Sequence, residues 1–152
     1  MLTYLWVALA VIPSPILILI SSEAIAIIGV LKGYSPLGLA AALAIGQTIG
    51  FSTLIHLSDW ICERSARFSA LKARADLDQY RQYAPRLALW AAFVGIPPMN
   101  LSSVAIGAVS AQLLVVTPLI LIGRFTRYWI IASLPEVFEE YINPDLLPSW
   151  IL

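Results

Sequence analysis

Charged residues are scarce in this chain and are absent from three long stretches. Asp, Glu, Lys and Arg make up 12% of the sequence and hydrophobic residues 60%, whereas soluble domains carry roughly 25% charged and 45–50% apolar residues. Residues 1–22, 33–58 and 87–123 contain none of these four residue types. Each stretch exceeds the roughly 18 residues that indicate a spanning segment, and the mean hydropathy is +0.86. We therefore predict an integral membrane protein with one membrane domain over residues 1–152.

Residue types that usually carry catalysis or bind metals are also rare. The single cysteine, Cys62, excludes an intramolecular disulfide, and the single histidine, His56, leaves no metal-ligand cluster. The sequence has no Gly-x-Ser-x-Gly motif and no glycine-rich phosphate loop. These absences argue against an enzyme, a metal site and a bound cofactor. His56 could relay protons, although an interfacial hydrogen-bonding role is commoner for such a residue.

Prolines interrupt two of the apolar segments. Pro13 and Pro15 lie in the middle of residues 2–31, and a proline pair lies within residues 87–116. A proline inside a helix removes a backbone donor and clashes with the preceding turn, so neither segment should form one straight helix. Each is either a kinked span or a re-entrant hairpin, and a hairpin persists at membrane depth only where protein or a water-filled cavity covers it. The sequence leaves both alternatives open.

The two halves of the chain repeat one pattern. Residues 12–25 (IPSPILILISSEAI) are echoed by residues 96–106 (IPPMNLSSVAI), and in each half a proline, Pro36 or Pro118, opens the next apolar segment. Doubled, proline-interrupted hydrophobic segments are typical of transporters built from internal repeats. If both broken segments are re-entrant, each repeat contains one hairpin and one full span, and the second repeat is inverted relative to the first.

Basic residues are concentrated in one hydrophilic loop. Residues 62–86 hold six of the nine Lys and Arg residues, so the positive-inside rule places this loop in the cytoplasm. Acidic residues dilute its charge, and nucleic-acid binding is not expected. The acidic tail, residues 135–152, predicts an interfacial amphipathic segment. The whole pattern predicts an all-α polytopic membrane protein, with two broken segments and two full spans in repeats at about residues 2–61 and 87–134.

One predicted span is built for close helix packing. Ser35 and Pro36 suit the N-cap and first position of a helix over about residues 37–60. Within it, Gly46 and Gly50 form a GxxxG pair, which lets another helix approach closely. An internal helix is the first choice of partner, and a second copy of the chain, giving a homodimer, is the alternative.

Glu23 is the one carboxylate in the first broken segment. An ionisable group at membrane depth is a functional candidate by default, because its burial is costly. Removal from water favours the protonated carboxyl group, so Glu23 is the candidate for proton coupling. The alternative is that Glu23 only satisfies backbone groups of the hairpin.

Two arginines, Arg124 and Arg127, lie in the last apolar segment. Two mid-helix arginines cost roughly 5 to 7 kcal/mol, while the eight Leu, Ile and Phe residues of 119–134 return about 2.4 to 4.8 kcal/mol. The arginines therefore need protein, water or a bound anion. Residues three apart share a helix face, and two guanidinium groups suit a phosphate. Neutral side chains near the breaks could line the same headgroup cavity: Asn100, Ser102, Ser103 and Ser22. A structural pairing of the arginines with Glu23 or with hairpin carbonyls is the alternative.

From about Ile12 to Ala132 the chain resembles the DedA family of small membrane proteins (the VTT-domain or SNARE-associated group). The resemblance lies in the broken segment that ends in Ser22-Glu23, the small-residue helix, residues 93–107 and the sequence GRFTRYW. It implies two opposed re-entrant hairpins packed with spanning helices. The chain differs where the family has Pro-Gly-Glu in the first hairpin and arginines flanking the second Ile-Pro.

The resemblance implies a transport function. Members of the family are linked to flipping or scrambling of phospholipids and polyprenyl-phosphate carriers, in bacteria with dependence on the proton-motive force. The expected function is therefore translocation of an anionic lipid or lipid-linked phosphate across a bacterial inner membrane. The expected partners are membrane lipids and protons. The alternatives are a small-cation or drug exporter that uses Glu23, and a non-transporting assembly or scaffold protein.

Overall fold

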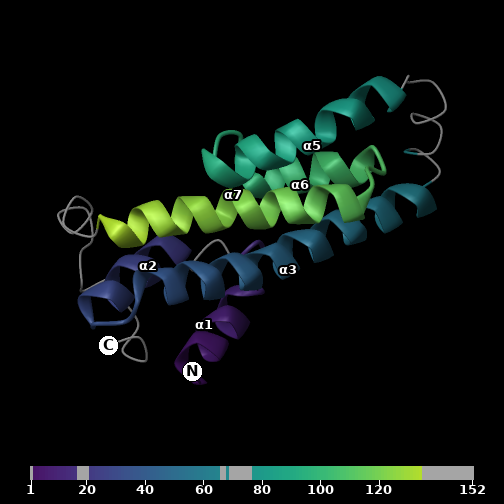
Figure 1. The fold of residues 1–152 in the computed structure, drawn as a ribbon. Helices are drawn as coiled ribbons and strands as arrows, with labels where there is room; N and C mark the ends of the chain where they lie inside the picture. The colour runs from purple at the N-terminus through teal and green to yellow at the C-terminus, as the bar shows by residue number, and fades with distance from the viewer. Residues whose placement is uncertain (1, 17–20, 66–67, 69–76, 135–152) are drawn as a thin grey trace.

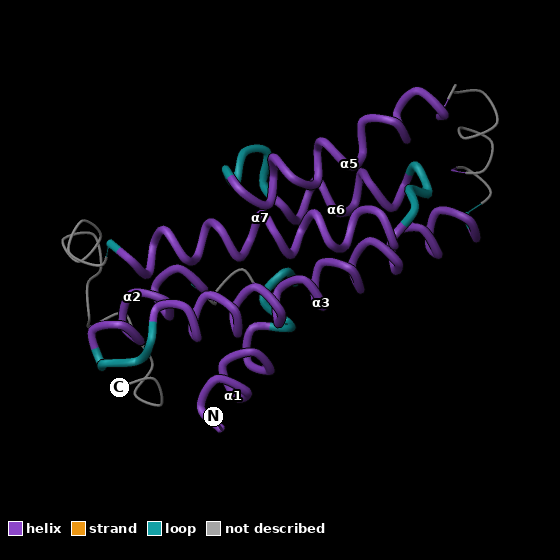
Figure 2. The backbone as a smooth tube through the Cα atoms, in the orientation of Figure 1, coloured by secondary structure: helices purple, strands orange, loops and turns teal. Residues whose placement is uncertain are grey.

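The computed structural model describes residues 2–16, 21–65, 68 and 77–134. Over these residues the chain has six helices and no strand (Figures 1 and 2), which confirms the all-α class. The helices are α1 (Leu2–Val11), α2 (Ser22–Leu31), α3 (Pro36–Arg64), α5 (Leu77–Phe93), α6 (Met99–Ala108) and α7 (Leu113–Ser133). The predicted acidic tail, 135–152, lies outside the described residues.

Two of the described helices are long, three are short, and α5 lies between them with 17 residues. Of those described, α3 with 29 residues and α7 with 21 are long and apolar enough to cross a membrane. At about 1.5 Å per residue they measure roughly 43 and 31 Å, against about 30 Å for a hydrocarbon core. Helices α1, α2 and α6 have 10 residues each and measure only about 15 Å. A helix of that length reaches through half of the core.

Both predicted breaks occur, and local chemistry explains where the helices stop. Helix α1 ends at Val11, whose carbonyl accepts a 2.7 Å hydrogen bond from the hydroxyl of Ser14 in the following turn. Helix α2 begins after Ser21, whose side chain caps it by accepting from the Ala24 N–H. In the second half, Gly95 adopts a positive φ of 85° between α5 and α6, a conformation that favours glycine.

Two prolines that the sequence associates with loops or helix starts lie inside helices. Pro118 does not open its segment, because α7 begins at Leu113. Pro85 lies within α5, which begins at Leu77 and so takes up part of the predicted loop 62–86. Pro118 lies in the second turn of α7 and has no N–H to donate to the carbonyl of Leu114, so α7 lacks one backbone hydrogen bond there. Packing of α7 against α3 and α5 outweighs this local loss.

Helices α3 and α7 run antiparallel along each other and form the centre of the fold (Figure 1). Helices α1 and α2 cover the first half of α3 and the last half of α7, around the buried residues Leu43, Ala44 and Tyr128. Helices α5 and α6 cover the opposite halves, around Phe51 and Ile120. The described chain therefore has two apolar cores, one at each end of the central pair.

Each pair of shorter helices doubles back as a hairpin. At the open end of the α1–α2 hairpin the Tyr4 hydroxyl accepts a 3.1 Å hydrogen bond from the Ser35 N–H, and at its turn Pro15 lies against Gly50 in the middle of α3. At the open end of the α5–α6 hairpin Arg81 Nε donates to the Val109 carbonyl at 2.8 Å. The open ends lie at opposite ends of the α3–α7 pair, so the two turns approach each other near its middle (Figure 1).

The glycine pair of α3 is covered from within the chain. A Cβ added at Gly46 or Gly50 would overlap the backbone carbonyl of Ala8 or Ile12, so α1 packs directly on the α3 backbone. This face is the internal contact that the GxxxG spacing predicts, and it is closed to a second copy of the chain in this conformation. Gly123 of α7 plays the same part for α5, because a Cβ there would crowd Ala92.

Candidate functional site

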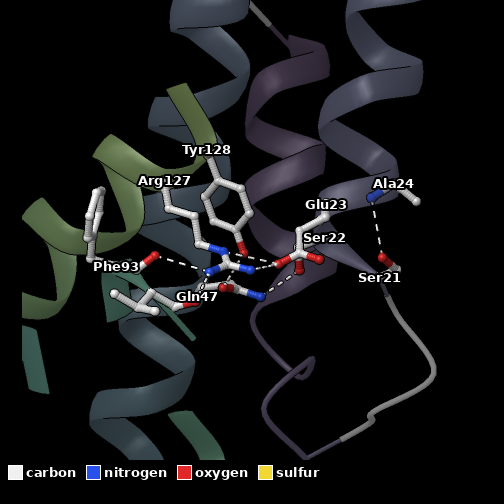
Figure 3. A network of polar contacts seen from close by, with 9 residues as sticks. Ser21, Ser22, Glu23, Ala24, Gln47, Phe93, Arg127 and Tyr128 are labelled. Atoms are coloured by element: carbon white, nitrogen blue, oxygen red, sulfur yellow. Dashed lines mark hydrogen bonds and ion pairs between the residues drawn. The ribbon is translucent and has the colours of Figure 1, made fainter. Parts of the chain in front are cut away.

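An ion pair between Glu23 and Arg127 lies where the two hairpin turns meet (Figure 3). Glu23 is in the first turn of α2 and Arg127 is two turns from the end of α7. Arg127 donates to Glu23 Oε1 twice, from Nη2 at 2.6 Å and from Nε at 3.1 Å. The carboxylate also lies at the N-terminus of a helix, where the helix dipole favours negative charge.

The same guanidinium group caps the end of α5. Arg127 Nη1 donates to the carbonyls of Phe93 at 3.1 Å and Val94 at 2.5 Å. Carbonyls at a helix C-terminus lack intrahelical donors, so Arg127 satisfies groups that the proline break has released. Gly95 permits this approach, since an added Cβ would lie 2.8 Å from Arg127 Nη1. Arg127 therefore links the first hairpin, through Glu23, to the turn of the second.

The ion pair is accessible from outside the protein. The side chain of Glu23 is 46% exposed and that of Arg127 is 24% exposed. Both charged groups can therefore be reached from the surface of the protein.

A buried hydrogen-bond network centred on Gln47 lies next to the ion pair. The side-chain amide of Gln47 in α3 donates to Ser22 Oγ at 2.5 Å and to Ser14 Oγ at 3.1 Å, and its oxygen accepts from the Tyr128 hydroxyl at 2.5 Å. Both donors and the acceptor of the amide are thus used, which fixes its orientation. The network ties the turn of the first hairpin to both central helices, directly beside Glu23 (Figure 3).

Arg124 points into the protein and away from the exposed ion pair. It is 7% exposed, and its guanidinium carbon lies 4.9 Å from the centre of the Phe51 ring, a cation–π distance. In the described part of the chain its Nε has no hydrogen-bond acceptor. Arg124 and Arg127 therefore do not form a shared exposed anion site in this conformation. The buried cation adds positive potential beneath Arg127.

The crossing of α3 and α7 is built from reciprocal pairs. Placing Gly46 onto Gly123 in sequence brings Gln47 onto Arg124 and Phe51 onto Tyr128. In the structure Gln47 bonds Tyr128, while Arg124 stacks on Phe51. Gln47 and Arg124 are equivalent positions, and so are Phe51 and Tyr128. Each contact therefore joins a residue of α3 to the α7 residue that is equivalent to the other α3 residue. The two contacts thus use equivalent positions of α3 and α7 with the helices exchanged.

Several residues predicted from the sequence lie apart from the ion pair. Ser102 is buried and donates to the Pro98 carbonyl at 3.2 Å, within its own helix. Ser103 is buried, and Asn100 is half-buried at the start of α6. No hydrogen bond within the described residues joins these three to Glu23 or to either arginine. Ser22 is buried in the Gln47 network, and His56 is exposed on α3.

Sequence reasoning missed Gln47 and Tyr128, which position the site. Gln47 is an amide within a charge-free, small-residue helix, and a buried amide needs partners. Tyr128 lies four residues after Arg124, on the same helix face. Both signals are present in the sequence, but neither identifies the partner across the bundle.

The site thus places an accessible guanidinium group beside an accessible carboxylate. Within the described residues no group of three His, Cys, Asp or Glu side chains could hold a metal ion. Comparison of the chain with protein-family models, with characterised proteins and with solved structures gave no match.

Proposed function

We propose that the chain is an integral membrane protein that translocates an anionic lipid or a lipid-linked phosphate between leaflets. The observation that carries this proposal is the accessible Glu23–Arg127 ion pair at the meeting point of two opposed helical hairpins. The resemblance to the DedA family supports the same reading from the sequence. In this proposal α1–α2 and α5–α6 are re-entrant hairpins, α3 and α7 are spans, and the two halves form an inverted repeat.

The proposed mechanism is an exchange of anions on Arg127. A phosphate takes the position of the Glu23 carboxylate on the guanidinium fork, which accepts bidentate oxygen pairs. Protonation of Glu23 removes the competing charge and favours phosphate binding. Deprotonation restores the ion pair and releases the headgroup. Arg124 remains stacked on Phe51, and its buried positive charge adds to the attraction between Arg127 and the phosphate.

The position of the pair suits lipid movement. Ten-residue hairpin helices of about 15 Å bring the turns to the middle of an approximately 30 Å core. A headgroup that crosses the bilayer meets its highest barrier there. A cation and a carboxylate held at that depth by protein lower the barrier for a phosphate.

The test is lipid translocation in proteoliposomes, with a fluorescent phosphatidylglycerol in one leaflet and a membrane-impermeant quencher outside. Glu23→Gln and Arg127→Lys are each expected to slow translocation tenfold or more, because a glutamine cannot displace the headgroup from Arg127 and a lysine cannot present two parallel donors to a phosphate. Both should elute like the parent protein, and translocation is compared per folded molecule. The matched control is Glu63→Gln, which removes an exposed carboxylate at the far end of α3.

Other outcomes separate the alternatives. A parent protein that moves no lipid contradicts the proposal. An exporter of cations would then show Glu23-dependent cation flux in the same vesicles. A scaffold would show neither activity, and Glu23→Gln would leave its assembly unchanged. Loss of stability in Glu23→Gln, at unchanged translocation per folded molecule, would assign the ion pair to structure alone.

A further inference from the structure

A groove opens between α1 and α2, apart from the Glu23–Arg127 site. It has a volume of about 380 Å³, which lies in the range of small-molecule sites, about 300–1,000 Å³. Neither Glu23, Arg127 nor Gln47 lines it. The groove therefore has its own walls and its own chemistry.

The walls of the groove are apolar along most of its length. Helix α1 contributes Trp6, Val7 and Ala10, and α2 contributes Ile25 and Ile28. Trp6 is 63% exposed, so an indole side chain stands at the opening. Walls of this kind suit a hydrocarbon chain, as apolar cavities of about 150 Å³ already bind benzene.

The outer end of the groove is polar. Lys32, the C-cap residue of α2, lines the groove there together with Tyr34. The rings of Tyr4 and Tyr34 pack edge to face beside it, 6.0 Å apart. Tyrosines and a lysine at the end of apolar helices are typical of the membrane–water interface. An amphiphile in the groove would thus place its headgroup at a cation.

The charge decides which lipid binds. Inside a bilayer an acyl chain gains little from moving into an apolar groove, because lipid tails are as apolar as the side chains. Preference between lipids must therefore come from the headgroup. We propose that the groove between α1 and α2 binds one acyl chain of a net-anionic glycerophospholipid, with the headgroup phosphate at Lys32. This site does not depend on translocation at Glu23.

The test uses Trp6 as a reporter inside the groove. A variant in which Trp60, Trp90, Trp129 and Trp150 are replaced by Phe leaves Trp6 as the only tryptophan. The protein is reconstituted in phosphatidylcholine vesicles that contain a small mole fraction of either acyl-brominated phosphatidylglycerol or acyl-brominated phosphatidylcholine. Brominated chains quench tryptophan on contact. We expect phosphatidylglycerol to be about fivefold more effective at equal mole fraction, the ratio that one basic side chain gives near an anionic headgroup.

Two variants assign the preference to the groove. Lys32→Gln should equalise quenching by the two lipids, and Ala10→Phe, which fills the groove, should abolish the preference as well. Arg64→Gln is the matched control, since it removes an exposed charge at the other end of α3, and it should keep the preference. Circular dichroism checks that each variant is folded.

The proposal is overturned by any of three results. Equal quenching by both lipids in the parent would mean that Trp6 meets only bulk lipid. A preference that survives Lys32→Gln would place the anionic headgroup elsewhere. A preference lost equally in Arg64→Gln would reflect net charge alone. Translocation measured on the Lys32→Gln protein reports separately on the Glu23–Arg127 site.

Discussion

Single side chains hold the two hairpins in place at the middle of the bundle. Arg127 satisfies backbone carbonyls at the end of α5 and a carboxylate at the start of α2. Gln47 uses its whole amide to connect Ser22 with Tyr128. In an apolar bundle such polar contacts are the specific ones, because apolar packing alone distinguishes poorly between neighbouring registers. The site therefore depends on residues that contribute more to geometry than to net stability.

The first prediction concerns the hydroxyl of Tyr128. Tyr128→Phe leaves Gln47 Oε1 buried without its donor, which costs about 1–3 kcal/mol in soluble proteins, whereas interhelical bonds in membranes average about 0.6 kcal/mol. We expect a loss on the order of 1 kcal/mol and a lower melting temperature in detergent. Tyr34→Phe, at an exposed ring, should melt like the parent. Equal melting of both variants would contradict a stabilising role for the Gln47 network.

For single residues, the sequence predicts which charged side chains matter better than it predicts which residues they contact. Glu23 and Arg127 stand out because a charge in an apolar segment is costly, and a pairing between them is one of the alternatives that the sequence leaves open. The divergence of Arg124 from Arg127 is not predictable, since it depends on Phe51 lying opposite in α3. Only their distance in sequence from the break predicts that Asn100, Ser102 and Ser103 lie near it. Their orientation depends on how α6 rotates against α3.

At the scale of elements, proline and glycine explain most of the architecture. The breaks after Val11 and Phe93 follow from prolines within apolar segments, and Ser35 caps α3 as its sequence predicts, accepting from the Gly38 N–H at 3.5 Å. Pro118 behaves differently: it removes one backbone bond and crowds the carbonyl of Leu114, at a cost of about 3 kcal/mol, and the packing of α7 against α3 and α5 outweighs that cost. Local sequence identifies each residue type but not the packing that tolerates it.

The second prediction tests the direct contact of α1 with the backbone of α3. Gly46→Ala would place a methyl group against the Ala8 carbonyl, so α1 must move away, and overpacking typically costs about 1–3 kcal/mol. Gly38→Ala is the matched comparison, because its added methyl group would meet the end of the Tyr4 side chain and not a backbone carbonyl. Both changes raise helix propensity by about 1 kcal/mol. We expect Gly46→Ala to melt lower than Gly38→Ala, and the reverse order would show that α1 packs elsewhere.

At the scale of the whole molecule, the described parts of the two halves share one order of elements, and their long helices α3 and α7 run antiparallel. Each half has a hairpin followed by a long helix, and the long helices cross through the reciprocal pairs of Gln47 with Tyr128 and Arg124 with Phe51. The sequence repeat predicts two similar halves, but not their relative direction, because a kinked span and a hairpin share the same hydrophobic pattern. Direction is decided by contacts between distant residues, such as Tyr4 with Ser35.

The third prediction follows from this direction. In the arrangement with two opposed hairpins, the turn at Tyr34 and the turn at Gln112 lie at opposite ends of the α3–α7 pair (Figure 1). If the two broken segments instead crossed the bilayer fully, an additional crossing would separate α3 from α7, and both turns would face the same side. Single cysteines at Tyr34 and Gln112, in a Cys62→Ser background, are labelled with a membrane-impermeant maleimide in vesicles of each orientation. We expect labelling from opposite sides, with Gln112 on the cytoplasmic side that the basic loop predicts.

A cysteine at Glu63 is the control, because it reports the cytoplasmic end of α3 under either arrangement and so validates the vesicle orientation. Labelling of Tyr34 and Gln112 from one side would contradict the hairpins and indicate four kinked or straight spans.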